Sequence, residues 1–170
     1  MASVKEDVLS ALAALGVSYE LLEHAPVHTM EDCKAAEEAL GGVMPKNLFL
    51  TPRNHASHHL LIARADAPFR TARISRQLGV SRLSFATAEE LMEMLRTLPG
   101  AISPMGLLFD GEKKVRLAID RALRGEERLL FHPCVNTATL AVSGADFFER
   151  LLPALGHEAA YVDMEGEDAE

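Results

Sequence analysis

The sequence contains little cysteine and no long apolar run. Its 170 residues include only two cysteines, Cys33 and Cys134, which lie far apart and lack zinc-finger spacing. This excludes a disulfide framework and a zinc-finger module. No run approaches the roughly 18 apolar residues that cross a membrane, and the charged first seven residues do not resemble a signal peptide. We therefore expect a cytoplasmic protein that does not interact with membranes.

The length and composition indicate one globular domain. A chain of 170 residues can bury most of its surface without a metal or a disulfide. Apolar residues make up 48% of the chain and charged residues 25%, which is ordinary for a globular protein. Repeats, low-complexity segments and internal linkers are not evident. We expect a domain over residues 1–157 and a disordered acidic tail over residues 158–170.

The charge is distributed unevenly. The net charge of −8 argues at first against nucleic acid, because phosphate binding needs a basic surface. Six of the acidic residues follow His157, however, and without them 19 acidic residues stand against 17 basic ones. Within residues 44–82 only Asp66 is acidic. This segment covers a solvated face or contacts nucleic acid, and both interpretations stay open; its basic residues are Lys46, Arg53, Arg64, Arg70, Arg73, Arg76 and Arg82.

Hydrophobic periodicity and capping signals predict about seven strands and five helices. Capping boxes begin helices at Ser3 and Thr87. Strands and helices do not alternate regularly, so we predict an α+β fold with a single mixed, mostly antiparallel sheet surrounded by helices. The predicted helices cover residues 3–15, 29–40, 71–78, 87–98 and 143–155. The predicted strands cover residues 17–22, 47–51, 59–63, 83–86, 106–109, 115–119, 129–131 and 140–142. We expect the strands over residues 47–51 and 59–63 to form a hairpin.

Polar residues interrupt three apolar segments. Residues 131–142 place His132, Asn136 and two threonines between predicted strands, and residues 44–50 and 99–107 have the same character. Polar groups at the edge of a sheet need partners or serve a ligand. Three such loops on one small domain predict a single pocket.

Four motifs occur in register along the chain. They are Pro45-Lys46-Asn47-Leu48-Phe49-Leu50, Gly79-Val80-Ser81-Arg82-Leu83-Ser84-Phe85-Ala86, Gly100-x-x-Ser103-Pro104-x-Gly106-Leu107 and His132-Pro133-x-x-Asn136-Thr137-Ala138-Thr139. Together they resemble the YbaK/prolyl-tRNA synthetase-associated family of editing domains, and within that family the chain is most similar to the freestanding alanyl-tRNA(Pro) deacylases. The resemblance runs from about residue 4 to residue 157. It departs from the family at Ala101, where relatives often carry serine.

The resemblance implies a YbaK-like fold and the hydrolysis of the ester that joins alanine to proline tRNA. A synthetase pocket sized for proline cannot firmly exclude a smaller residue, because a missing methylene changes binding by only about 1–3 kcal/mol. A second, smaller pocket would remove the error. The implied partners are mischarged tRNA and, transiently, prolyl-tRNA synthetase, and the oligomeric state stays open, with a homodimer one option. Two alternatives remain, a deacylase for serine or cysteine and a tRNA-binding module without catalysis.

The resemblance also implies roles for particular residues. Lys46 would hold the terminal phosphate or the acyl oxygen, and the turn between Gly100 and Gly106 would present backbone amides to the ester carbonyl. His132 acts as a base or positions the loop or the terminal ribose, and both readings stay open. The candidate catalytic residues are thus Lys46, Gly100, Ser103 and His132. The candidate substrate-binding residues are Asn47, Ile102, Pro104, Gly106, Asn136 and Thr137, and the candidate tRNA-binding residues are Arg53, Arg73, Arg76 and Arg82.

Two further chemistries are set aside. Cys134 lies two positions from His132, but free cysteines are most often inert core residues, so we do not expect a thiol nucleophile. Five histidines in the first 59 residues lack a regular spacing with a carboxylate or thiolate. We therefore expect no metal and no cofactor.

Overall fold

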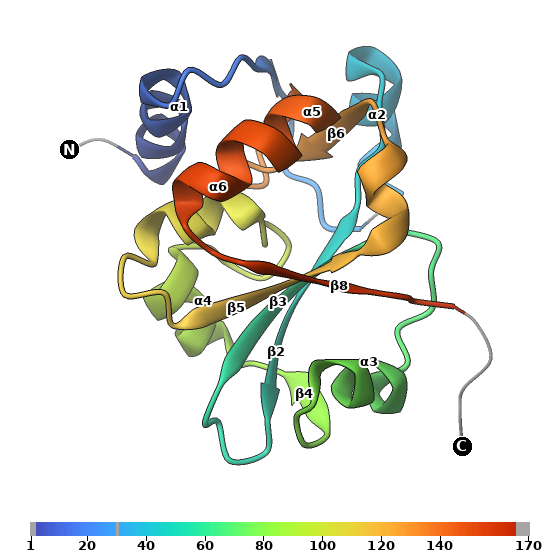
Figure 1. Cartoon of the computed structure of the whole chain (residues 1–170). Helices are drawn as coiled ribbons and strands as arrows, with labels where there is room; N and C mark the ends of the chain where they lie inside the picture. Colours follow the sequence, from blue (N-terminus) through green and yellow to red (C-terminus); the bar gives the residue numbers. More distant parts are fainter. Residues whose placement is uncertain (1–2, 30, 166–170) are drawn as a thin grey trace.

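The computed structural model describes residues 3–29 and 31–165, and its strands form two sheets rather than one. A five-stranded sheet has the order β4-β2-β3-β5-β8, and a three-stranded sheet has the order β1-β7-β6 (Figure 1). The strands are β1 (Glu20–Glu23), β2 (Lys46–Pro52), β3 (His58–Ala63), β4 (Leu83–Phe85), β5 (Val115–Asp120), β6 (Arg128–Phe131), β7 (Ala138–Ser143) and β8 (Ala159–Val162). The α+β class is confirmed, whereas the prediction of a single sheet is wrong.

The segment between α2 and β2 explains why the two sheets separate. Val43 makes one parallel bridge with Leu129, which ties the small sheet to the segment that leads into β2. The ladder cannot continue, because Pro45 has no N–H to donate. Gly42, the residue before Val43, approaches β6 very closely. A Cβ at this position would lie 2.6 Å from Cδ1 of Leu130 and 2.9 Å from the carbonyl oxygen of Arg128. The small sheet is antiparallel throughout, and the large sheet adds two parallel pairs, β3 with β5 and β5 with β8.

Helices cover both faces of the large sheet (Figure 1). The capping boxes predicted at Ser3 and Thr87 are both formed, each with the glutamate three residues later. The helices are α1 (Val4–Ala14), α2 (Lys34–Leu40), α3 (Thr71–Leu78), α4 (Ala88–Leu95), α5 (Gly144–Asp146) and α6 (Leu152–Leu155), with a π-helical turn over Phe147–Leu151 and 3₁₀ turns η1 (Pro104–Phe109) and η2 (Arg121–Gly125). Among the described residues, none of these helices is long and apolar enough to cross a bilayer.

The predicted strand over residues 106–109 is wrong, because these residues form η1. Ser103 accepts a hydrogen bond from the N–H of Met105 at 3.1 Å, and Pro104 fixes the first residue of the turn. Gly106 lies so close to α4 that a Cβ would meet the Leu95 carbonyl oxygen at 2.7 Å. The chain therefore turns onto α4, and β5 pairs in parallel with β3 instead.

The predicted acidic tail begins within the fold. Residues 159–162 form β8 beside β5, and Val162 and Met164 are buried under α3. Asp163 pairs with Arg121 at 3.1 Å. The described part of the segment is therefore not the disordered tail that we expected, because its apolar residues complete the large sheet. The last acidic residues of the predicted tail, Glu167, Asp168 and Glu170, lie outside the described residues.

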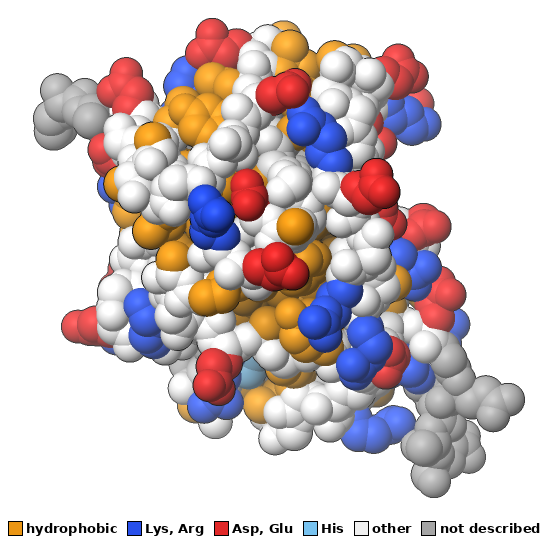
Figure 2. Space-filling view, turned by 45° about the horizontal axis from the view of Figure 1, so that its top comes forward, with side chains coloured by type: hydrophobic (Ala, Val, Ile, Leu, Met, Phe, Trp, Pro, Cys, Tyr) orange, Lys and Arg blue, Asp and Glu red, His pale blue; other side chains and the backbone are white. Residues whose placement is uncertain are grey.

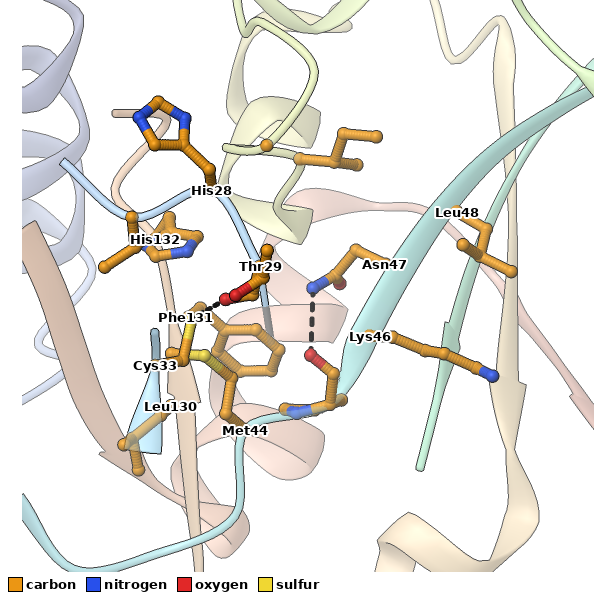
Figure 3. Close-up of a pocket in the computed structure, with 14 residues that line it drawn as sticks. His28, Thr29, Cys33, Met44, Lys46, Asn47, Leu48, Leu130, Phe131 and His132 are labelled. Carbon is orange, nitrogen blue, oxygen red and sulfur yellow. Dashed lines mark hydrogen bonds between the residues drawn. The ribbon is translucent and has the colours of Figure 1, made fainter. Parts of the chain in front are cut away.

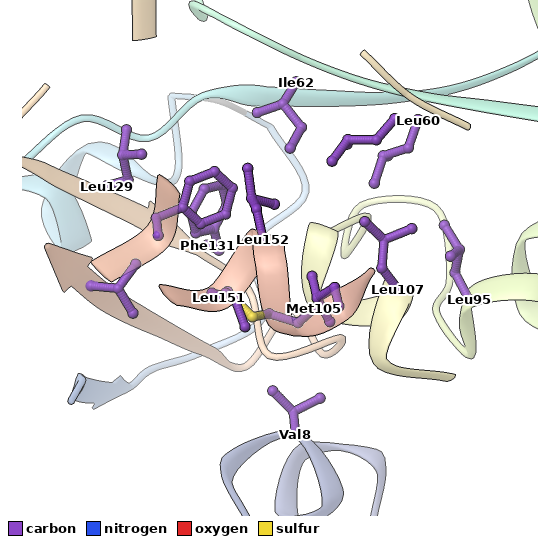
Figure 4. Packing of buried hydrophobic residues seen from close by; sticks show 14 of the residues in the cluster. Val8, Leu60, Ile62, Leu95, Met105, Leu107, Leu129, Phe131, Leu151 and Leu152 are labelled. Atoms are coloured by element: carbon purple, nitrogen blue, oxygen red, sulfur yellow. The ribbon is translucent and has the colours of Figure 1, made fainter. Parts of the chain in front are cut away.

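Side-chain alternation along β2 decides which residues face the main core. Phe49 belongs with Leu60 and Ile62 of β3 to the core between the sheet and helices α1, α4 and α6. Figure 4 shows Leu60 and Ile62 within this core. Leu48 and Leu50 face the smaller core under α3. Because successive side chains of a strand point to opposite faces, Asn47 lies on the face of the main core and Lys46 on the face of α3.

Candidate functional site

A cavity of about 300 Å³ lies where the two sheets meet. Four segments line it (Figure 3), and most of the lining is apolar. The lining residues are Val27, His28, Thr29 and Cys33 before α2, Met44 to Leu48 around the start of β2, Gly100 and Ile102 before η1, Leu130 and Phe131 at the end of β6, and His132 directly after it. The predicted pocket of three loops is therefore formed, and a fourth segment adds to it.

Five of the candidate residues meet at this cavity: Lys46, Asn47, Gly100, Ile102 and His132. They come from three parts of the chain that are some 30 to 50 residues apart in sequence, and the fold brings them to one place. Their chemical roles remain predictions.

His132 is held as a neutral hydrogen-bond acceptor. The side chain is buried, and its Nδ1 lies 2.9 Å from the carbonyl oxygen of Ala138. A carbonyl only accepts, so Nδ1 carries the proton and Nε2 keeps a lone pair. Burial lowers the pKa of His132 from its ordinary value of 6.5, and the nearby His24 adds to the effect. The neutral form therefore predominates at pH 7, where Nε2 can accept a proton or a hydrogen bond.

Asn47 carries the one buried side-chain polar atom in the described part of the chain that has no hydrogen-bond partner, its Oδ1. Its Nδ2 donates to the carbonyl of Pro45 at 3.4 Å, and Oδ1 is shielded from solvent although the residue itself lines the cavity. An unsatisfied buried acceptor costs about 1–3 kcal/mol. A bound ligand that donates a hydrogen bond to Oδ1 would recover that energy.

Lys46 lies at the rim of the cavity and not at its centre. Its ammonium donates to the carbonyl oxygen of Ala67, on the α3 side of the sheet. Figure 3 shows the side chain extending away from His132 and Thr29. In this arrangement the ammonium does not contact the groups at the cavity centre.

The loop before η1 shapes the cavity through its backbone. Gly100 has a φ of +91°, a conformation that suits glycine. The Thr97 hydroxyl donates to the Ala101 carbonyl at 2.8 Å, and the methyl group of Ala101 is buried, so a serine side chain is not needed to form this turn. Ser103, Pro104 and Gly106 are buried beneath the loop and do not line the cavity. The Ser103 hydroxyl caps the start of η1, and the predicted roles of these three residues remain predictions.

Asn136 and Thr137 also lie outside the cavity, in a separate hollow beside Arg96 and Cys134. Asn136 donates through Nδ2 to the carbonyl of Val27 at 3.1 Å, and its own carbonyl accepts from the N–H of Val27. The carbonyl of Thr137 accepts from the N–H of His24. These residues therefore hold the segment that lines the cavity, and they do not face the cavity themselves.

Cys134 has no catalytic character. Burial raises the pKa of its thiol to about 12, so the nucleophilic thiolate is absent at neutral pH. The thiol lines the hollow of Asn136 and not the cavity of His132. Its exclusion as a nucleophile agrees with the structure.

The segment before α2 is the part of the site that the sequence analysis missed. We predicted a helix from Thr29, whereas α2 begins only at Lys34. The Asp32 carboxylate accepts from the N–H groups of His28 and Thr29, and the Thr29 hydroxyl accepts from the N–H of Asp32. The pattern Thr-x-x-Asp signals such a turn, and its position next to the cavity depends on long-range pairing through Asn136.

The four candidate tRNA-binding arginines are spread over the surface. Arg73 donates to the backbone carbonyls of Asp163 and Glu165, so part of its hydrogen-bonding capacity is used within the fold. Arg53 is exposed at the turn after β2, at the other end of that strand from the cavity, and Arg82 is exposed before β4. Arg76 is exposed on α3. Basic and acidic side chains are interspersed on the face shown in Figure 2.

Comparisons with known proteins identify the family to which this chain belongs. The model of the aminoacyl-tRNA editing domain matches residues 24–149. The chain belongs to this family.

Individual relatives match nearly the whole chain. The prolyl-tRNA editing protein ProX of Acetoanaerobium sticklandii is 31% identical over 160 residues, 94% of this chain and 97% of the relative. The prolyl-tRNA synthetase associated domain-containing protein 1 of Danio rerio is 31% identical over 87% of this chain and 81% of the relative. A crystal structure of a candidate trans-editing enzyme for prolyl tRNA synthetase superimposes with a TM-score of 0.73 at 20% identity, over 98% of this chain and 99% of that one. The last likeness shows that the fold is shared.

Proposed function

We propose that the protein is a trans-editing deacylase that hydrolyses mischarged alanyl-tRNA(Pro). It is an aminoacyl-tRNA deacylase by family, and its match to the ProX protein supports proline tRNA as the substrate. The observation that carries the proposal is the cavity between the sheets, where an unpartnered amide oxygen of Asn47 and a neutral His132 occur together. We further propose that it acts in the cytoplasm, with prolyl-tRNA synthetase as a transient partner.

The lining of the cavity suits a small apolar side chain. Met44, Ile102, Leu130 and Phe131 provide apolar surface for a methyl group, and the polar groups are few. The α-ammonium of the aminoacyl group would donate to Asn47 Oδ1 after a rotation of the amide toward the cavity, which supplies the partner that this oxygen lacks. The terminal ribose would place a hydroxyl against His132 Nε2. Lys46 would exchange the Ala67 carbonyl for a phosphate of the terminal nucleotides at the cavity mouth.

The reaction needs little more than positioning, because an aminoacyl ester is already activated. The oxygen of a water molecule adds to the carbonyl carbon, and the bond from that carbon to the ribose 3′ oxygen breaks. The leaving oxygen takes a proton, which releases free alanine and tRNA with an intact terminal hydroxyl. Backbone amides of the loop at Gly100 would stabilise the negative charge that develops on the carbonyl oxygen, and the ribose 2′-hydroxyl against His132 would direct the water.

The activity is tested with a panel of proline tRNAs charged with alanine, serine, cysteine or proline. We expect release of alanine at least about tenfold faster than release of the other three. Fastest release of serine or cysteine would assign the enzyme to another amino acid. Binding of tRNA without release of any amino acid would instead identify a non-catalytic module.

Replacing Lys46 with alanine is expected to lower kcat/KM about 10- to 100-fold, mainly through KM, because one charge-assisted phosphate contact is worth about 1.5–3 kcal/mol. The slope of the logarithm of the binding constant against the logarithm of the salt concentration should become shallower by about one, since one phosphate contact is lost. Deacylation kinetics at two ionic strengths measure both effects. Lys34→Ala is the matched control, since Lys34 is an exposed lysine at the start of α2. Equal kinetics of Lys46→Ala and wild type would remove Lys46 from the site.

The pH dependence of deacylation should follow His132. Its pKa lies below the ordinary 6.5 because of burial, so the imidazole loses its acceptor only as the pH falls through that lowered value. We expect kcat to be level from about pH 6.5 to 8 and to decline at lower pH. His132→Ala should be slow at every pH and lack the decline. A decline that persists in this variant would assign the titration to another group.

A further inference from the structure

A second cluster of chemically active side chains lies at the tip of the β2–β3 hairpin. His55 in the turn, His58 at the start of β3 and Glu90 in the first turn of α4 place their ligand atoms within 4.8 Å of one another. Strand β2 separates this tip from the cavity, and seven residues of strand span about 20 Å. The cluster is therefore remote from the site described above (Figure 1).

The Glu90 carboxylate lies between the two imidazoles. His55 Nδ1 is 2.9 Å from Oε1, and His58 Nε2 contacts Oε2. Burial acts to raise the pKa of Glu90, but hydrogen bonds from His58, His55 and Thr87 outweigh it and lower that pKa to about 2. Glu90 is therefore an ionised carboxylate at any physiological pH, with two nitrogen ligands facing it.

The fold holds two of the three side chains in place before any ligand binds. Thr87 donates to Glu90 Oε1 from both its N–H and its hydroxyl, at 3.3 Å and 3.1 Å. The His58 ring stacks on Phe49, with ring centroids 5.7 Å apart. The His58 and Glu90 side chains are 14% and 20% exposed, whereas His55 is 49% exposed. The cluster is thus fixed on its inner side and open to water on its outer side.

We propose that His55, His58 and Glu90 form a binding site for a divalent transition metal, with Zn²⁺ as the best fit. Two imidazole nitrogens and one carboxylate oxygen are a ligand set that Zn²⁺ prefers, and a water molecule on the open side completes a tetrahedron. Ligand atoms in such a tetrahedron are roughly 3.3 Å apart. The ligand atoms, within 4.8 Å of one another, would reach this value by rotation of the two histidines. Binding requires neutral imidazoles and releases any proton that the pair shares with Glu90.

The metal would fasten the hairpin to α4 and take no part in hydrolysis. His55 and His58 belong to the hairpin and Glu90 to the helix. One ion would therefore join two elements of the fold, and His58 and Glu90 are 32 residues apart in the sequence. Arg53, an exposed arginine in the same turn, would be held with them. The proposal does not depend on the deacylase activity.

Zn²⁺ titration of the full chain after removal of metal with a chelator tests the proposal. Glu90→Gln is the informative variant, because glutamine keeps the capping box while it removes the charged ligand. Glu89→Gln is the matched control, since Glu89 is exposed on the same turn. We expect wild type and Glu89→Gln to bind one Zn²⁺ per chain by calorimetry, and Glu90→Gln to bind more than about tenfold more weakly.

Co²⁺ supplies a second readout, because its visible absorption reports nitrogen and oxygen ligands directly. The spectrum of the wild type should be lost in His58→Ala and in His55→Ala. If His58→Ala unfolds because the contact with Phe49 is lost, His55→Ala still tests the site. Zn²⁺ should also raise the melting temperature of wild type and Glu89→Gln but not of Glu90→Gln. Weak, non-stoichiometric binding by wild type, or equal binding by Glu90→Gln, would mean that the cluster is an ion-pair network only.

Discussion

Filling the cavity by Ile102→Trp is expected to reduce deacylation of alanyl-tRNA(Pro) more than about 100-fold. Ile102 lines the cavity and is only half-buried, so the larger side chain occupies the space for the aminoacyl group without forcing the core apart. Displacement of a reacting group by about 1 Å already costs on the order of 100-fold in rate. Single-turnover release of alanine measures the effect.

Leu98→Trp is the control for this experiment. Leu98 precedes the same loop, is 59% exposed and lines the hollow of Asn136 in place of the cavity. Surface substitutions of this kind change free energies by about 0.5 kcal/mol, so the rate should stay within about twofold of wild type. Retained activity in Ile102→Trp, or equal losses in both variants, would contradict a reaction in the cavity.

Asn47→Ala is expected to separate activity from stability. If Oδ1 receives the substrate ammonium, its loss removes a hydrogen bond to a charged group, worth about 1.5–3 kcal/mol, and kcat/KM falls about 10- to 100-fold. The free energy of unfolding should hardly change, because the substitution also removes a buried acceptor without a partner. We expect a melting temperature within about 2–4 °C of wild type.

Asn54→Ala provides the comparison, since Asn54 is exposed in the hairpin turn. It should retain the rate of wild type. Asn47 is a structural residue if Asn47→Ala strongly lowers the melting temperature and lowers kcat/KM by no more than the fraction of the variant that is unfolded. Stability and kinetics measured on the same preparations distinguish these outcomes.

Local signals in the sequence account for much of the fold. The capping boxes at Ser3 and Thr87 and the hairpin of β2 and β3 form as predicted, because each depends on residues that are close in sequence. The strand β8 was missed, since its Ala-Ala-Tyr-Val run lies between acidic residues and gains stability only beside β5. The 3₁₀ turn at Gly106 was missed for a similar reason, as its apolar run is shaped by packing on α4.

The site was predicted only in part, because some of its residues are brought together by long-range contacts and not by local sequence signals. Motif order placed Lys46, Asn47, Ile102 and His132 at one cavity. Strand alternation, which is readable from the sequence, places Lys46 and Asn47 on opposite faces of β2. The lining before α2 depends on the long-range bond from Asn136 to Val27, which no local pattern reveals. Likewise, the carboxylate beside His55 and His58 comes from another element, so histidine spacing alone gave no sign of it.

The most direct measurement is a crystal structure with a non-hydrolysable substrate analogue, adenosine carrying alanine through a 3′-amide. The account predicts alanine in the cavity between the sheets, with its ammonium within hydrogen-bond distance of Asn47 Oδ1 and the ribose 2′-hydroxyl on His132 Nε2. Alanine bound in the hollow of Asn136 and Cys134, or on the surface with the cavity unfilled, would contradict it.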